Sequence, residues 1–234
     1  MIEIKNLSKR FGEKNVIDNL SFSFDGKILG ICGAKKTGKT VLLNIICGII
    51  PPSEGEVLIA GEAISNDSAL SNKTVGYLLE GSPMPLEMTP TEFLNFVGEA
   101  KKIPAGKLSK QIAAALDITG LEPLKKVYIK HLSIGQRKML GAAQALLGNP
   151  KLVVLDDPFS GLNKQEIATM KNIITTLSEI KTVIISASSK MVISDLCSEV
   201  IALSEETTDD STEEIAEAIE ALVDASSEEE KEDE

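Results

Sequence analysis

One stretch decides the fold of this chain: Gly33-Ala34-Lys35-Lys36-Thr37-Gly38-Lys39-Thr40. It matches in full the pattern GxxxxGK followed by Ser or Thr. The apolar run before it, residues 28–32, is typical of a short buried strand, and residues 38–47 have the pattern of a helix that Gly48 closes. A glycine-rich loop between a strand and a helix is the context in which this pattern forms a phosphate site rather than a chance turn.

The residue types in this loop suit phosphate chemistry. Gly33 and Gly38 let the backbone bend so that successive N–H groups point at phosphate oxygens, and the helix N-terminus adds a partial positive charge. Lys39 supplies a full charge near the β and γ phosphates of a nucleotide, and the Thr40 hydroxyl is a suitable ligand for Mg²⁺. The sequence therefore predicts a nucleoside triphosphate with magnesium at this loop.

An acidic residue at the end of another buried strand provides the second half of this site. Residues 152–155 are four consecutive apolar residues, and Asp156 follows them. Ligands of α/β folds bind where the parallel strands end. Asp156 is therefore expected to hold Mg²⁺ through water.

The remaining elements follow from hydrophobic periodicity. We expect strands at residues 2–7, 16–24, 55–60, 75–79, 182–185 and 200–203, and helices at 91–101, 106–117, 134–147 and 164–179. Thr89 with Glu92, and Asn163 with Glu166, are capping boxes at two helix starts. This order predicts an α/β fold: a P-loop NTPase core with a parallel sheet, an N-terminal antiparallel β subdomain, and an α-helical subdomain inserted at about residues 84–140.

The charge of the chain is concentrated at its C-terminus. Of 234 residues with a net charge of −11, residues 205–234 hold 15 acidic residues and one lysine, so residues 1–204 carry 23 basic against 20 acidic ones. We expect one folded domain at 1–204 and an acidic, solvated tail at 205–234, disordered after about residue 225, with a partner-binding role as the alternative. Ser211 and Glu214 predict a short helix in this tail. Its apolar face would carry Ile215, Ile219, Leu222 and Val223.

Composition excludes several classes of protein. No stretch approaches the roughly 18 apolar residues of a membrane span, and the N-terminus lacks the pattern of a signal peptide, so we expect a cytoplasmic chain. Cys32, Cys47 and Cys197 are an odd number with no close pair, which favours small buried residues over a disulfide or metal site. Basic arms and coiled-coil heptads are absent, which argues against a nucleic-acid partner.

A third motif lies between the two halves of the phosphate site. Leu132-Ser133-Ile134-Gly135-Gln136, followed by Arg137, resembles the LSGGQ signature of ABC transporter ATPases. The order of motifs from Met1 to about Leu203 is similar to that family throughout. The resemblance, which is nearest to the ATP-binding subunits of exporters with separate membrane chains, implies that the nucleotide is ATP.

The signature segment can also form an anion site on physical grounds. Ser133 can cap a helix with Gln136 as its capping-box partner, which leaves free N–H groups and a hydroxyl at a positive helix end. The resemblance implies that Ser133, Gly135 and Gln136 meet the γ-phosphate held by an opposite subunit, so that ATP joins a dimer. Ile134 replaces the first signature glycine, whereas the close-approach glycine, Gly135, remains.

The resemblance also implies roles for two residues outside these motifs. Phe11 falls where the family stacks an aromatic ring on adenine, although a strand residue of this kind could equally belong to the core. Glu80 occupies the place of a metal-contacting glutamine; a glutamate keeps the oxygen ligand and adds a negative charge.

Three further substitutions bear on ATP hydrolysis and on communication between the two sites of a dimer. Asp157 stands where the family has its catalytic glutamate, and its side chain is one methylene shorter, so it reaches less far toward the attacking water. Ser188 stands where the family has a histidine at the γ-phosphate, and the one histidine, His131, is expected to be structural. Asn163 replaces an aspartate that links the two sites of a dimer. We therefore expect strong ATP binding with slow hydrolysis.

Two functions from different classes fit these motifs. The first is an energy-coupling subunit, peripheral on the inner face of the membrane, that pairs with an identical or a related ATP-binding subunit and with ABC membrane subunits. In this interpretation Asp157, Lys39 and Ser188 act on ATP hydrolysis. The alternative is an ATP-dependent switch module that regulates a soluble protein partner with little catalysis.

Overall fold

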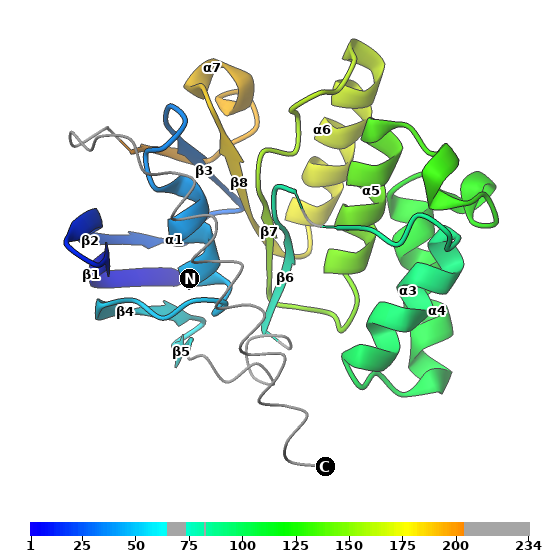
Figure 1. The fold of residues 1–234 in the computed structure, drawn as a ribbon, viewed down its shortest axis with the longest axis horizontal. Helices are drawn as coiled ribbons and strands as arrows, with labels where there is room; N and C mark the ends of the chain where they lie inside the picture. The colour runs from blue at the N-terminus through cyan, green and yellow to red at the C-terminus, as the bar shows by residue number, and fades with distance from the viewer. Residues whose placement is uncertain (65–73, 82, 204–234) are drawn as a thin grey trace.

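The computed structural model describes residues 1–64, 74–81 and 83–203 of the chain. Within these ranges the strands form two sheets (Figure 1), one antiparallel and one parallel. The expected tail helix at residues 211–223 lies outside the described residues. The bounds of the domain and of the helical insert therefore stay predictions, whereas the α/β fold class is confirmed.

The antiparallel sheet is built from the N-terminal part of the chain. Its spatial order is β2 (Lys14–Phe24), β1 (Ile2–Phe11), β4 (Glu54–Ile59) and β5 (Glu62–Ala63). The register pairs Ile2 with Phe24 on one side of β1 and with Ile59 on the other. Strand β1 runs to Phe11, beyond the predicted end at residue 7, because β2 begins at Lys14 and pairs with it up to the turn.

The parallel sheet has the spatial order β6 (Val75–Leu78), β7 (Leu152–Leu155), β8 (Thr182–Ala187), β3 (Ile28–Cys32) and β9 (Glu199–Ala202). Successive side chains of its central strands enter two different cores: Leu152 and Val154 face one, while Val153 and Leu155 face the other. Burial on both faces explains the continuous apolar runs in the sequence.

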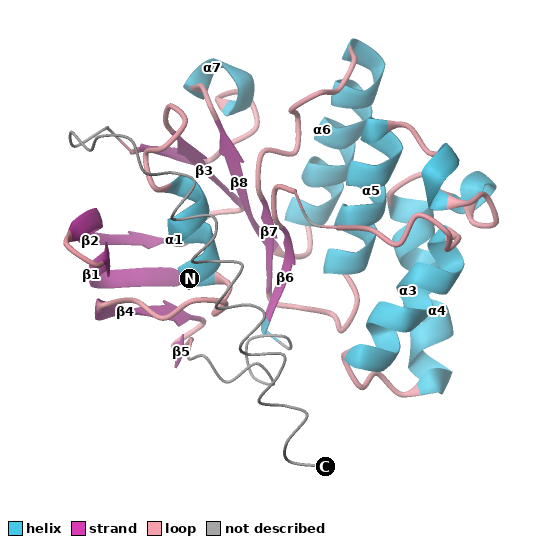
Figure 2. Ribbon diagram, in the orientation of Figure 1, coloured by secondary structure: helices cyan, strands magenta, loops and turns pink. Residues whose placement is uncertain are grey.

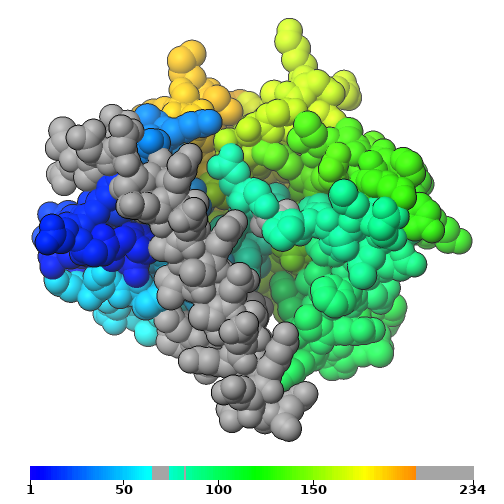
Figure 3. All heavy atoms as spheres, in the orientation of Figure 1, coloured from blue at the N-terminus to red at the C-terminus, as the bar shows by residue number. Residues whose placement is uncertain are grey.

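Helices cover both faces of the parallel sheet. They are α1 (Lys39–Ile46), α3 (Pro90–Ala100), α4 (Ala105–Ile118), α5 (Ile134–Ala145), α6 (Lys164–Ser178) and α7 (Lys190–Ile193), with short 3₁₀ turns at Glu122–Leu124 and Ile129–His131. Helix α1 fills the core between the two sheets. On the opposite face of the parallel sheet α5 and α6 pack against the strands, and α3 and α4 pack against α5 (Figure 2). The space-filling view shows the strands of the N-terminal sheet and the α3–α4 pair at opposite sides of the molecule (Figure 3).

Local sequence signals set the helix ends. The predicted capping boxes at Thr89, Ser133 and Asn163 are all formed, each with side-chain and backbone hydrogen bonds in both directions. Helix α1 ends where Gly48, at φ 70°, lets the chain leave the helix. Cys32 and Cys47 are buried, Cys197 is half-buried, and all three are free.

Gly76 in β6 is expected to be essential for stability. A Cβ atom on this residue would lie 1.8 Å from the backbone oxygen of Ala145 in α5, where backbone leaves no room to adjust. We expect Gly76→Ala to lower the free energy of unfolding by about 2–3 kcal/mol, the upper part of the range for overpacking. Denaturant unfolding would measure this loss. Gly106→Ala is the control, because a Cβ there meets nothing within 4 Å, and an equal loss in both variants would contradict the packing argument.

Candidate functional site

The phosphate loop is held in shape by its own lysine. Gly38, at φ 83°, caps the start of α1 in a left-handed conformation that favours glycine. The Lys39 ammonium donates to the backbone oxygens of Gly33 and Ala34, at 2.7 and 2.6 Å. The loop therefore curls around the ammonium group at the positive end of α1, a position that favours an anion.

Asp156 joins this loop to the end of β7. Its side chain is almost fully buried, and Thr40 Oγ1 donates to its Oδ2 at 3.1 Å. Ser186 in β8 donates its hydroxyl proton to the other carboxylate oxygen, Oδ1. Strand β8 was predicted to end at residue 185, but it continues to Ala187 and so brings Ser186 into the site.

Asp157 has an unusual backbone conformation. Its φ of 44° lies in the left-handed region, which Asp and Asn tolerate better than most other residues. The amide of Asp157 donates to Ser186 Oγ at 2.8 Å, and its carbonyl oxygen accepts from Lys138 Nζ at 2.5 Å. Both the N–H and the carbonyl group of the candidate base are thus held by hydrogen bonds to side chains.

Loops from four parts of the chain enclose a cleft of about 560 Å³, within the range of small-ligand sites. Its lining consists mainly of charged and hydroxyl side chains. These residues are Lys35, Lys36, Lys39, Thr40, Glu80, Asp156, Asp157, Phe159, Ser160, Ala187, Ser188 and Val192. The structure therefore brings together the phosphate loop, Glu80, both aspartates and Ser188, as the sequence predicted.

Burial and neighbouring charges act on the ionisable groups in this cleft. Burial lowers the pKa of Lys39, although the negative charges of Asp156 and Asp157 oppose this shift. Burial also raises the pKa of Asp157, and the positive charges of Lys138 and Lys39 oppose that rise. The site thus pairs acidic and basic groups in partly desolvated surroundings, a combination typical of functional sites.

The donor set fits a magnesium ion. The Thr40 hydroxyl and the Asp156 carboxylate lie side by side, and Glu80 lines the same cleft. Mg²⁺ in phosphate-binding enzymes takes one or two such oxygen ligands together with water and substrate phosphates. Thr40, Asp156 and Glu80 are therefore the residues that would hold it.

The capping residues of the signature segment do not line the cleft of their own chain. Ser133 caps α5: its Oγ accepts from Gln136 N at 3.1 Å, while Gln136 Oε1 accepts from Ser133 N at 2.9 Å. None of Ser133, Gly135 and Gln136 lines the cleft. The expectation of a free serine hydroxyl was wrong, because Ser133 Oγ donates to Glu166 Oε1 at 2.8 Å.

Glu166 also lies against the glycine that the signature retains. A Cβ on Gly135 would lie 2.4 Å from the carboxyl carbon of Glu166 and 2.5 Å from its Oε1. The other oxygen of Glu166 accepts from the backbone of Asn163 and completes the cap of α6. One carboxylate therefore ties the first turns of α5 and α6 together.

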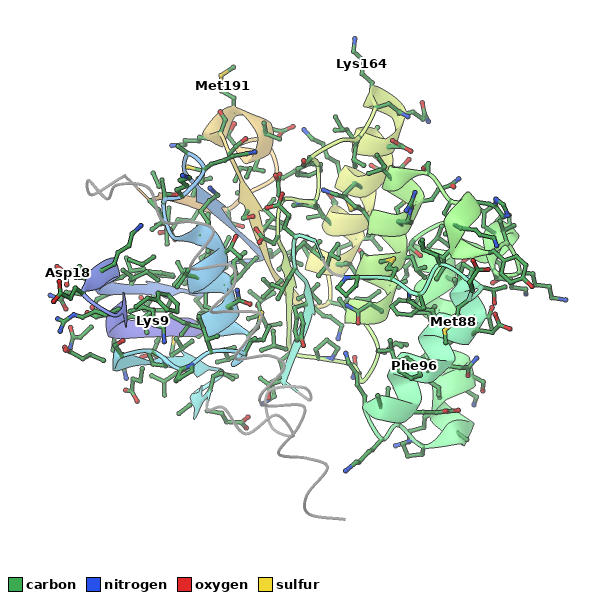
Figure 4. All side chains as sticks on the ribbon, in the orientation of Figure 1. Lys9, Asp18, Met88, Phe96, Lys164 and Met191 are labelled. Carbon is green, nitrogen blue, oxygen red and sulfur yellow. The ribbon has the colours of Figure 1, made fainter. Side chains whose placement is uncertain are left out.

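Phe11 and His131 lie outside the cleft. Phe11 is half-buried against the core that α1 joins, and the ammonium of Lys9, which is labelled in Figure 4, lies 4.9 Å from its ring centre. Its stacking on adenine stays a prediction. His131 is exposed in the 3₁₀ turn before the signature and does not line the cleft.

A family model described as "ABC transporter" matches residues 17–160, which include the phosphate loop, the signature and both aspartates. The chain belongs to the ABC transporter family. An ABC transporter ATP-binding protein of Bacillus subtilis, YybJ, is 32% identical over 84% of this chain and 89% of its own length. The Nod factor export ATP-binding protein I of Sinorhizobium fredii is 32% identical over 69% of this chain and 48% of that protein.

Solved structures of ABC transporter ATP-binding subunits share the fold. A cassette described in its ADP conformation has a TM-score of 0.76, with 25% identity over 87% of each chain. A dimeric bacterial ABC transporter cassette has a TM-score of 0.76 at 23% identity, and covers 87% of this chain and 94% of its own. Among the described residues of this ABC transporter protein, no helix is both long and apolar enough to cross a membrane.

Sequence reasoning missed three residues of the candidate site and of the signature cap: Ser186, Lys138 and Glu166. Each acts through a contact with a residue far along the chain. The serine-rich end of β8 was visible in the sequence, but no local pattern assigns Ser186 to Asp156. Glu166 was recognised only as a capping residue, which is one of its two roles here.

Proposed function

We propose that this chain is the energy-coupling subunit of an ABC transporter, which binds Mg-ATP and dimerises around it. The observation that carries the proposal is the convergence of Lys39, Thr40 and Asp156 in one cleft at the N-terminus of α1. The relatives named as ATP-binding proteins support ATP as the ligand.

Dimerisation follows from the separation of the two phosphate-binding elements. The signature segment does not line the cleft of its own chain, so in our proposal it closes over ATP held by a second subunit, identical or related. Solved dimers of cassettes with the same fold support this arrangement.

Hydrolysis in this site would use the residues at the end of β7 and β8. Asp157 is the candidate general base, and its carboxylate would accept the proton of the attacking water. Lys39 would stabilise negative charge on the phosphate oxygens, and Ser188 would offer a hydroxyl near the terminal phosphate. Mg²⁺, when bound, neutralises charge between the outer phosphates. The short reach of Asp157 and the absence of an imidazole at Ser188 favour slow turnover.

Coupling to membrane subunits is proposed for a second, more apolar hollow of about 230 Å³. It is lined in part by Glu80, Met84 and Leu86, and Glu80 and Asp156 belong to both hollows. Movement at the ATP site would therefore reach the surface on which membrane subunits are expected to act, from the cytoplasmic side.

A pull-down from detergent-solubilised membranes, with and without ATP, tests this function. We expect a multi-span membrane protein to co-purify with the tagged chain. Recovery of a soluble partner alone would contradict the transport function and favour the switch module.

Glu166 is expected to weaken the ATP-driven dimer. Its carboxylate lies on Ser133 and Gly135, where our proposal places a phosphate of the partner's ATP, and like charges repel. Glu166→Gln keeps the size of the side chain and removes the charge, so we expect the dimer to tighten about fivefold. Sedimentation of the ATP-bound protein would measure this change. Glu179→Gln, at the other end of α6, is the control, and a weaker dimer in Glu166→Gln would contradict the repulsion.

A further inference from the structure

Lys138 makes a contact that none of the roles above uses. It lies on α5, shortly after the signature segment Ser133–Gln136, and its side chain is half-buried. Its ammonium donates to the backbone oxygen of Asp157 at 2.5 Å, across 19 residues of sequence. A lysine ammonium that reaches a backbone carbonyl loses part of its hydration. The free-energy cost of this desolvation must be offset by favourable interactions at the new position.

Those interactions come from the acidic groups of the ATP site. The ammonium of Lys138 is attracted by the negative charges of Asp157, Glu80 and Asp156. Lys138 and Glu80 also line the same apolar hollow beside the cleft. The lysine is thus held at the acidic end of the parallel sheet, where charge–charge attraction is less screened than on the open surface.

The contact stabilises the backbone of Asp157 in a conformation that is unfavourable for a non-glycine residue. Asp157 has a φ of 44°, and a non-glycine residue keeps such a conformation when its surroundings enforce it. Ser186 Oγ accepts from the amide of Asp157 at 2.8 Å. The Asp157 carbonyl accepts from the Lys138 ammonium at 2.5 Å and from the amide of Ser160 at 3.3 Å. Lys138 thus adds a charged side-chain donor to a turn, and together these bonds set the direction in which the Asp157 side chain leaves the backbone.

We propose that Lys138 is a positioning residue for ATP hydrolysis, because its ammonium holds the backbone of Asp157 in the orientation that directs the carboxylate into the cleft. The role rests on the proposed function of Asp157 as the base. Since Lys138 lies on the helix that begins with Ser133, it also connects the partner-facing signature to the base of the same chain. A shift of α5 on dimer closure would thus move the Asp157 carbonyl directly.

The test compares Lys138→Met, Lys138→Arg and the exposed control Lys110→Met on α4. Methionine keeps the apolar stem of the lysine and removes the donor, whereas arginine keeps a charged donor. We expect Lys138→Met to lower kcat about tenfold, with the Kd for Mg-ATP within threefold of the wild type. Lys138→Arg should keep at least a third of the wild-type kcat. The control Lys110→Met should have the same kcat as the wild type.

A second measurement does not depend on turnover. Hydrogen–deuterium exchange of the segment 152–160 should become several-fold faster in Lys138→Met and stay unchanged in Lys138→Arg and Lys110→Met. Unchanged exchange in Lys138→Met, or a parallel loss of kcat and ATP affinity, would overturn the proposal. The affinity of the wild type for Mg-ATP tests the proposed function. The exchange measurement tests the role of Lys138 and needs no nucleotide, so the failure of one can be told from the failure of the other.

Discussion

Lys39→Ala is expected to lower the affinity for Mg-ATP about 10²–10³-fold. The Lys39 ammonium is the full positive charge at the centre of the phosphate loop, and it lies within hydrogen-bonding distance of the backbone of Gly33 and Ala34. A charge pair near 4 Å contributes roughly 4 kcal/mol at the effective dielectric constant of such sites, which corresponds to about a thousandfold in affinity. Titration with a fluorescent ATP analogue would measure the loss.

The alanine variant also removes two hydrogen bonds that shape the loop, so folding must be followed separately. Thermal unfolding should show a small change, because the loop keeps Gly33, Gly38 and the start of α1. Lys107→Ala, an exposed substitution on α4, is the control for losing one lysine. An affinity in Lys39→Ala equal to that of the wild type would show that the loop does not hold the phosphates, and the proposed function would fall with it.

Elements defined by local chemistry were predictable from the sequence. The capping boxes at Thr89, Ser133 and Asn163 need residues only three positions apart, and all three form as expected. The apolar runs at 28–32 and 152–155 predicted strands that are buried on both faces, because no alternation with polar residues was present. The glycine–lysine pattern predicted the loop between β3 and α1, because its context, strand then helix, is also local.

Contacts between distant segments were not predictable in the same way. Ser186 and Asp156 are 30 residues apart, and Ser133 and Glu166 are 33 apart, so no periodic pattern connects them. The sequence predicted a free signature hydroxyl for this reason: the capping box is local, whereas the carboxylate that occupies the serine comes from another helix. The end of β8 was misplaced by two residues because Ser186 and Ala187 lack the apolar, branched character of the strand before them.

Asp157→Glu combined with Ser188→His is expected to raise kcat about 10- to 100-fold. The longer carboxylate would reach further toward the attacking water, and hydrogen-bond reach limits a general base before its pKa does. The imidazole would add a donor at the terminal phosphate, where a single well-placed donor contributes roughly 10²–10³ in rate. Single-turnover ATP hydrolysis would measure the gain, with the Kd for Mg-ATP as a separate readout.

The left-handed backbone of Asp157 predicts that the glutamate variant gains activity but loses stability. At φ 44°, a glutamate is tolerated less well than an aspartate, so the glutamate variant should be less stable than the wild type by about 0.5–1 kcal/mol. Ser188→His alone should leave stability unchanged, because Ser188 is exposed after the end of β8. If kcat stays at the wild-type value while ATP binds normally, the short carboxylate does not limit the reaction. The slow step would then lie in closure of the dimer, where Ser133 must exchange Glu166 for a phosphate.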